Sequence, residues 1–169
     1  MLSTKRQPFV IYCFARAAFG NAEINPMKLE AAITLKVLPR PHFSRVVREG
    51  ITGFAQAHGV DEDDLAHVMT AVGEALANAI EHSGTELPIE VEIKFDMQQF
   101  IVTVRDFGVG FEPSERPQAT LPGGDCERGR GLPIMQHCCD TFSVTSQPGA
   151  GTTVVLGRSL RSRTSTHVA

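Results

Sequence analysis

Four short segments between residues 74 and 153 hold the side chains best suited to bind a charged small molecule. They are a helical stretch with Glu74 and Asn78, and the segments Asp106-Phe107-Gly108-Val109-Gly110, Arg128-Gly129-Arg130-Gly131-Leu132 and Gly149-Ala150-Gly151-Thr152-Thr153. Together they supply carboxylates, an amide and closely spaced glycines. Their order and chemistry indicate a nucleotide site.

The aspartate segment suits the base of a nucleotide. A fixed carboxylate such as Asp106 accepts a hydrogen bond from an exocyclic amine. Gly108 and Gly110 let the backbone turn sharply and approach a purine without a Cβ clash.

The other segments suit phosphates and a magnesium ion. The backbone N–H groups at the start of a helix bind phosphate, and Gly129 and Gly131 leave such donors uncovered. Magnesium prefers oxygen ligands and takes few from the protein, and Asn78 offers one. The phosphate-loop pattern GxxxxGK[ST] is absent, and Ile134 stands where a dinucleotide fingerprint needs glycine, so both of those nucleotide folds are disfavoured.

The elements that position these segments follow from hydrophobic periodicity. Apolar residues alternate with polar ones in the expected strands and recur at helical spacing in the expected helices. Gly59 provides a helix stop, and Asp61 is a suitable N-cap for the next helix. We expect strands at 31–38, 89–95, 100–104, 140–147 and 151–157, and helices at 43–58, 61–82 and 130–139.

The second helix carries the acidic part of the site. On a helical wheel, Glu74, Asn78, Glu81 and His82 fall close together and roughly opposite the apolar side. Asp106 follows a strand, where a loop begins. Residues 111–128 lack periodicity and are rich in Pro, Gly and charge, which predicts a long surface loop of a functional or disordered kind.

Length and composition favour one ordinary globular domain. A chain of 169 residues with 42% hydrophobic residues and 21% charged residues can bury a core and has no membrane-length apolar run. A net charge of −3 disfavours direct binding to nucleic acid. Cys13, Cys126, Cys138 and Cys139 lack paired metal spacing, which favours reduced thiols in a cytoplasmic protein.

The chain divides into three parts. Residues 1–27 resemble a signal peptide only superficially, because Arg16 interrupts the apolar run, so we expect a poorly ordered extension or a misassigned start. Residues 28–158 form the predicted core domain, which contains the motifs of the nucleotide site. Residues 159–169 form a flexible tail.

In combination, the motifs resemble a known superfamily. They are Glu-x₃-Asn-x₂-Glu-His within residues 73–82, DxGxG after a strand, GxGL opening a helix and Gly-Thr in a closing hairpin. This set resembles the GHKL ATP-binding superfamily, and the chain is most similar to its bacterial anti-sigma-factor serine kinases. The resemblance implies an α+β fold: a two-layer sandwich with a mixed, mostly antiparallel sheet covered on one face by about three helices.

The resemblance also assigns the contacts to ATP and Mg²⁺ by position. Asn78 would hold magnesium, and Asp106 would bind the adenine amine with the help of Thr152 or Thr153. The remaining expected ATP contacts are Gly108 and Gly110 at the adenine, and Arg128, Gly129, Arg130, Gly131 and Leu132 around the phosphates.

Glu74 occupies the position of the general base in the implied reaction, which is transfer of the γ-phosphate to a serine hydroxyl. Arg128 and Arg130 would neutralise phosphate charge or simply extend into solvent. His82 is more typical of a residue that packs against the helix end or caps it than of one with a direct role.

The implied function is that of an ATP-dependent anti-sigma factor that binds a sigma factor and phosphorylates an antagonist protein on serine. Family members commonly form homodimers. Two alternatives stay open: a nucleotide-sensing binding module without kinase activity, and the catalytic domain of a two-component histidine kinase. Against the latter, no long helical pair with a phosphoacceptor histidine precedes Glu74, and His42 and His58 lack that context.

Overall fold

A five-stranded sheet organises the chain in the computed structural model, which describes residues 31–96, 98–112 and 130–160. The strand order is β1-β2-β3-β5-β4. Every pairing among the described strands is antiparallel, which agrees with the prediction of a mostly antiparallel sheet. The strands are β1 (Ala31–Val37), β2 (Ile89–Phe95), β3 (Gln99–Arg105), β4 (Thr141–Gln147) and β5 (Gly151–Ser159).

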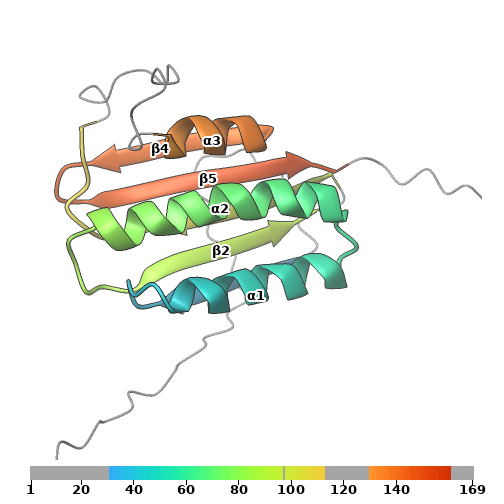
Figure 1. Ribbon diagram of the computed structural model, residues 1–169, viewed down its shortest axis with the longest axis horizontal. Coiled ribbons are helices and arrows are strands. Elements are labelled where there is room, and N and C mark those ends of the chain that lie inside the picture. The colour runs from blue at the N-terminus through green and yellow to red at the C-terminus, as the bar shows by residue number, and fades with distance from the viewer. Residues whose placement is uncertain (1–30, 97, 113–129, 161–169) are drawn as a thin grey trace, which may run out of the picture.

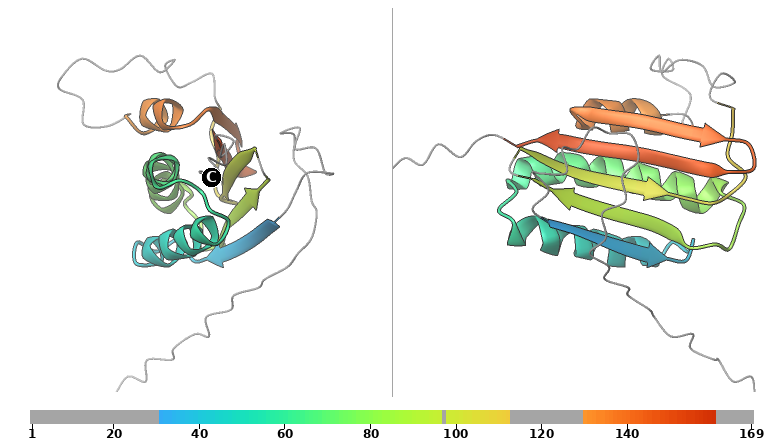
Figure 2. Two further views of the ribbon diagram at one scale, coloured as in Figure 1. Left: turned by 90° about the vertical axis from the view of Figure 1, so that its right-hand side faces the viewer. Right: turned by 180° about the vertical axis from the view of Figure 1, so that it is seen from behind.

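Among the residues that the structure describes, three helices cover one face of this sheet and none lies on the other face (Figure 1; Figure 2). The predicted two-layer α+β fold is therefore confirmed. The helices are α1 (Phe43–Ala57), α2 (Glu62–His82) and α3 (Gly131–Cys138).

The core lies between the two layers. Strict alternation in β2 turns Ile89, Val91 and Ile93 toward the helices, where each is completely buried. On α2, Val68 and Val72 are equally buried at helical spacing. Since burying one such side chain contributes roughly 1.5–3 kcal/mol, α2 is held firmly against the sheet.

The strand registers bring distant segments to one end of the sheet. Arg105, the last residue of β3, is opposite Glu90 near the start of β2 and opposite Thr153 near the start of β5. The short segment 83–88 links α2 to β2, so the C-terminal end of α2 reaches the same end of the sheet. This end holds the site.

Local capping agrees with the sequence. The Asp61 side chain accepts a hydrogen bond from the Asp63 backbone N–H at 2.9 Å, which confirms the predicted N-cap of α2.

At the far end of the sheet, Arg158 bonds Asp64 of α2 at 2.9 Å and Asp140 before β4 at 3.2 Å. This cluster ties β5 to α2.

Several predictions concern residues outside the described ranges. They are the extension at 1–27, the loop at 111–128 beyond residue 112, the tail beyond residue 160, and Cys13, Cys126, Arg128 and Gly129. Across the described residues, no helix combines the length and the apolar character needed to cross a membrane.

Candidate nucleotide site

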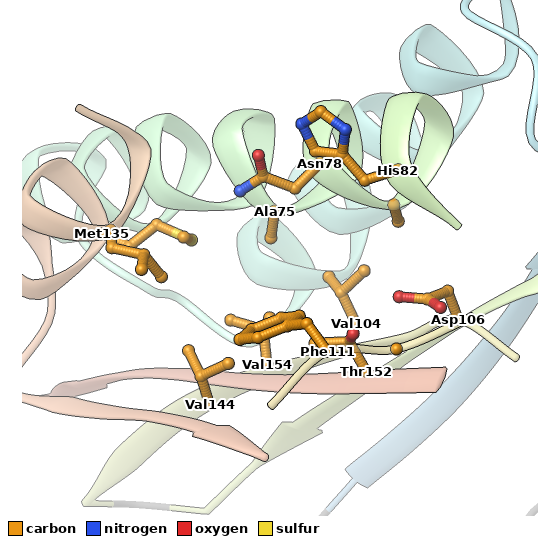
Figure 3. Close-up of a pocket in the computed structure, with 13 residues that line it drawn as sticks. Ala75, Asn78, His82, Val104, Asp106, Phe111, Met135, Val144, Thr152 and Val154 are labelled. Carbon is orange, nitrogen blue, oxygen red and sulfur yellow. The ribbon is translucent and has the colours of Figure 1, made fainter. Parts of the chain in front are cut away.

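A cavity of about 170 Å³ opens between α2 and the end of the sheet (Figure 3). It lies where the sequence motifs converge. Its lining residues are Ala75, Asn78, Ala79, His82, Val104, Asp106, Gly110, Phe111, Leu132, Met135, Val144, Thr152 and Val154.

Asp106 is the buried acid of this cavity, with 7% of its surface exposed. Its backbone N–H donates to the Thr152 carbonyl at 2.9 Å, and its Oδ1 accepts from the Gly108 N–H at 2.9 Å. A carboxylate has about four acceptor positions, so Asp106 keeps acceptor capacity for a donor in the cavity. A buried carboxylate with free acceptor positions suits a ligand that carries an amine.

Three glycines allow the loop that follows Asp106 to approach the backbone at the end of α2 and at the β4–β5 turn. A Cβ on Gly108 would lie 2.0 Å from the Ser83 carbonyl oxygen, and one on Gly151 would lie 2.2 Å from the Asp106 carbonyl oxygen. Gly110 has a φ of +58°, and a Cβ there would lie 2.0 Å from the Gln147 carbonyl oxygen. No other residue fits these positions without displacing backbone.

Hydrogen bonds fix the same loop on both sides. The Val109 N–H donates to the Ser83 carbonyl at 2.8 Å, and the Gly149 N–H donates to the Val109 carbonyl at 2.7 Å. The aspartate loop is therefore held between the end of α2 and the β4–β5 turn.

The helical wall of the cavity consists of small and polar side chains from α2. Ala75 and Ala79 are buried, and Asn78 and His82 line the cavity beside them. The polar side of α2 was predicted to lie opposite the buried side. In the structure it lies next to the buried side, because the cavity extends beneath this part of the helix. Glu81 is exposed and does not line the cavity.

The start of α3 closes the other end of the site. A Cβ on Gly131 would lie 3.1 Å from Glu74 Oε2 and 3.5 Å from Asn78 Nδ2, so the predicted base and the predicted metal-binding residue converge on this glycine. Leu132 lines the cavity. Arg130 is exposed at the N-terminal boundary of α3.

The β5 register separates the two threonines. Thr152 lines the cavity on the same face of β5 as the buried Val154 and Leu156. Thr153 alternates to the opposite face, opposite Arg105 and Thr145, and is not part of the cavity lining. Of the pair, only Thr152 is placed to assist Asp106.

Most of the apolar residues that line the cavity, including Phe111, were not identified from the sequence, and neither was Ser146, which lies beside the cavity. Phe111 lies between α2 and the sheet in Figure 3 and forms an apolar wall. Its backbone N–H donates to Ser146 Oγ at 2.9 Å, and Ser146 Oγ also lies 3.0 Å from Thr152 Oγ1. Phe111 had a signal, as a large apolar residue directly after DxGxG, whereas Ser146 had none.

The described cysteines have no role in this site. Cys138 and Cys139 are free thiols. Burial, followed by the neighbouring Cys138, raises the pKa of Cys139 to about 11, so this thiol stays protonated at neutral pH. Within the described ranges, no group of three or more His, Cys, Asp or Glu side chains is arranged to hold a metal ion.

The arrangement provides two chemically distinct ends. Asp106 and Thr152 offer acceptors next to apolar walls, which suits a flat amino-bearing ring. Glu74 and Asn78, one helical turn apart, lie beside Gly131 at the start of α3, and the start of a helix suits phosphates. Glu74 is half-buried.

Comparison with known proteins gives consistent matches. The family model described as a histidine kinase-like ATPase domain matches residues 38–158. The chain is 33% identical over 106 residues to the anti-sigma F factor of Pasteuria penetrans, covering 59% of this chain and 71% of that protein. It is 29% identical over 127 residues to the serine-protein kinase RsbW of Bacillus velezensis, covering 69% of this chain and 79% of the relative.

A solved structure agrees in fold. The crystal structure of the RsbU and RsbW domains of Rv1364c from Mycobacterium tuberculosis aligns with a TM-score of 0.59 and 20% identity. The alignment covers 77% of this chain and 32% of that longer chain.

Proposed function

The chain belongs to the histidine kinase-like ATPase domain family, and we propose that it is an ATP-dependent anti-sigma factor with protein-serine kinase activity. Membership confirms the GHKL resemblance inferred from the motifs. Relatives named as anti-sigma F factors and as a serine-protein kinase support this branch of the family. The partners are then a sigma factor and an antagonist protein that is phosphorylated on serine.

One observation carries the proposal: Asp106, Thr152 and Asn78 line the same cavity. Glu74 and Gly131 lie next to Asn78 at the start of α3. Gly131 brings the backbone at the start of α3 close to Glu74 and Asn78, so backbone donors and two polar side chains lie together, as a magnesium-bound triphosphate requires. Asn78 would supply the amide oxygen for the metal, and the backbone N–H groups of Gly131 and Leu132 at the start of α3 would supply donors for the phosphates. Magnesium, when bound with the nucleotide, neutralises phosphate charge.

Glu74 is the base in this mechanism. Its carboxylate accepts the proton of the substrate serine hydroxyl as the serine oxygen forms a bond to the γ-phosphorus. The bond from that phosphorus to the bridging oxygen breaks, and ADP leaves. The half-buried position of Glu74, next to Gly131, favours this role over that of an ordinary surface glutamate.

The remaining contacts are assigned to the nucleotide in the same way. Asp106 binds the adenine amine with help from Thr152, and the backbone at Gly108 and Gly110 supports the adenine. Residues 128–132 surround the phosphates, with Arg128 and Arg130 neutralising charge. The protein would act in the cytoplasm, where a sigma factor is found, and would form a homodimer, as members of the family commonly do.

The first experiment is calorimetric titration with Mg-ATP and Mg-ADP. Asp106→Asn keeps an oxygen for the Gly108 N–H but replaces a charged acceptor with a donor, so we expect roughly 10–100-fold weaker binding without loss of folding. Asp96→Asn is the matched control, because Asp96 caps the β2–β3 turn at the opposite end of the sheet. A folded parent that binds neither nucleotide would refute the ATP-dependent function.

The second experiment distinguishes an active protein-serine kinase from a nucleotide-sensing module without kinase activity. Glu74→Gln should lower the rate of serine phosphorylation of the cognate antagonist by about 10²–10⁴-fold while ATP affinity is retained. Undiminished phosphorylation would remove Glu74 from the mechanism. ATP binding by the parent with no phosphorylation of the antagonist would instead support a nucleotide-sensing module.

A further inference from the structure

Ser146 of β4 joins three polar groups at the base end of the cavity. Its Oγ donates to the Gly151 carbonyl at 3.2 Å, accepts from the Phe111 N–H at 2.9 Å, and lies 3.0 Å from Thr152 Oγ1. Ser146 is directly opposite Thr152 in the β4–β5 register, so the two hydroxyls share one face. No motif includes this serine.

The number of available hydrogens shows which hydroxyl donates in the hydrogen bond between Ser146 and Thr152. A serine hydroxyl has one hydrogen and two lone pairs. A carbonyl only accepts, so the Ser146 hydrogen is used on Gly151, and one lone pair is used by the N–H of Phe111. The bond between the two hydroxyls then takes its hydrogen from Thr152. Thr152 consequently presents only lone pairs to the cavity.

Asp106 presents acceptors to the same cavity, because an ionised carboxylate has no hydrogen to donate. Two adjacent groups at the base end therefore both accept. A 6-aminopurine offers two N–H donors at its exocyclic amine, directly or through a water. A 6-oxopurine offers a carbonyl oxygen at that position, so its 6-position gives neither protein group a donor.

We propose that Ser146 is a specificity-determining positioning residue, which fixes Thr152 as an acceptor and so increases the preference of the site for adenine over 6-oxopurine nucleotides. This inference rests on the proposed ATP site. Ser146 does not line the cavity and acts through Thr152. The same serine holds the backbone of Phe111, which keeps the apolar wall next to the pair it orients.

The test compares the dissociation constants of Mg-ATP and Mg-ITP. In Ser146→Ala, the Thr152 hydrogen is released and can rotate to donate to the oxo group. We expect the ratio of ITP to ATP dissociation constants to fall about fivefold, as for the exchange of one neutral hydrogen bond. Ser143→Ala, on the same strand but exposed on the other face, should leave the ratio unchanged.

A double-mutant cycle distinguishes this role from simple support of the fold. Thr152→Val keeps the branched shape and removes the hydroxyl, so it should also lower the ratio, and Ser146→Ala added to it should cause no further change. Equal weakening of ATP and ITP by Ser146→Ala, or an unchanged ratio in Thr152→Val, would overturn the proposal. Thermal melts check that each variant is folded.

Failure of this inference is separable from failure of the proposed function. If the parent binds neither ATP nor ADP, the nucleotide site itself is refuted. If the parent binds ATP and the variants keep the parental ratio of ITP to ATP dissociation constants, only the role of Ser146 is refuted.

Discussion

Gly108→Ala is the most direct test of how the aspartate loop is built. In the structure, a Cβ at residue 108 would lie 2.0 Å from the Ser83 carbonyl oxygen and 2.5 Å from the Ser83 Cα. Both are backbone atoms, so no side-chain rotation relieves the clash. The loop has to move away from the end of α2 by about 1 Å or more to reach an ordinary contact distance.

The expected cost follows from the bonds that such a movement breaks. The Gly108 N–H bond to Asp106 and the Val109 N–H bond to Ser83 both depend on the present loop position. Each contributes about 1 kcal/mol, and the overpacking itself costs roughly 1–3 kcal/mol. We therefore expect the free energy of unfolding to fall by about 4 kcal/mol, with weaker ATP binding, since Asp106 loses the bond that orients it.

Gly53→Ala is the matched control. Gly53 lies exposed within α1, and a Cβ there meets no atom within 4 Å. The same substitution should stabilise this helix by roughly 0.5–1 kcal/mol, because alanine loses less backbone entropy on folding.

Thermal and urea unfolding of the two variants measure these effects. At roughly 3 °C per kcal/mol for a domain of this size, Gly108→Ala should melt about 12 °C below the parent and Gly53→Ala about 2 °C above it. A Gly108→Ala protein that melts within 2 °C of the parent and binds ATP normally would refute the close approach of the loop to Ser83.

Three further predictions concern other parts of the chain. Gly131→Ala places a Cβ 3.1 Å from Glu74 Oε2, so phosphotransfer should slow about tenfold while the calorimetric ADP affinity stays within about threefold, since small displacements of reacting groups are costly. In urea unfolding, Arg158→Met should cost about 1–2 kcal/mol because this part-buried side chain joins two aspartates. Arg45→Met, at an exposed ion pair on α1, should leave the unfolding midpoint unchanged. The pKa of Cys139 is raised to about 11, so this thiol should react with iodoacetamide about 100-fold more slowly at pH 7.5 than an ordinary thiol. Peptide mass spectrometry follows the labelling, and the rate should rise with pH up to about 11. Fast labelling would contradict the burial of this thiol.

The sequence predicted the elements well because their patterns are local. The alternation of Ile89, Val91 and Ile93 identified a strand and its buried face, and Asp61 marked the start of α2 within one residue. The position of Asp106 at a strand end followed from the same periodicity. What the local pattern does not contain is the strand order, in which β5 pairs with β3 and brings Thr152 to Asp106.

The choice between Thr152 and Thr153 was nevertheless available from the sequence. Side chains alternate along a strand, and a shift of one residue exchanges the two faces. The apolar residues Val154 and Leu156 mark one face of β5 as buried, and Thr152 shares their parity. The prediction named both threonines because it used the motif alone and did not extend the alternation into it.

Ser146 shows where sequence analysis reaches its limit. It is one of five polar residues in β4, which also contains Phe142 and Val144, and its type gives no reason to prefer it over Ser143. Its importance depends on three distances that exist only after β4 pairs with β5 and the aspartate loop packs beside them. A hydroxyl acquires a direction from its partners, so the acceptor character of Thr152 is a property of the assembled hairpin, and only a measurement that compares two bases can detect it.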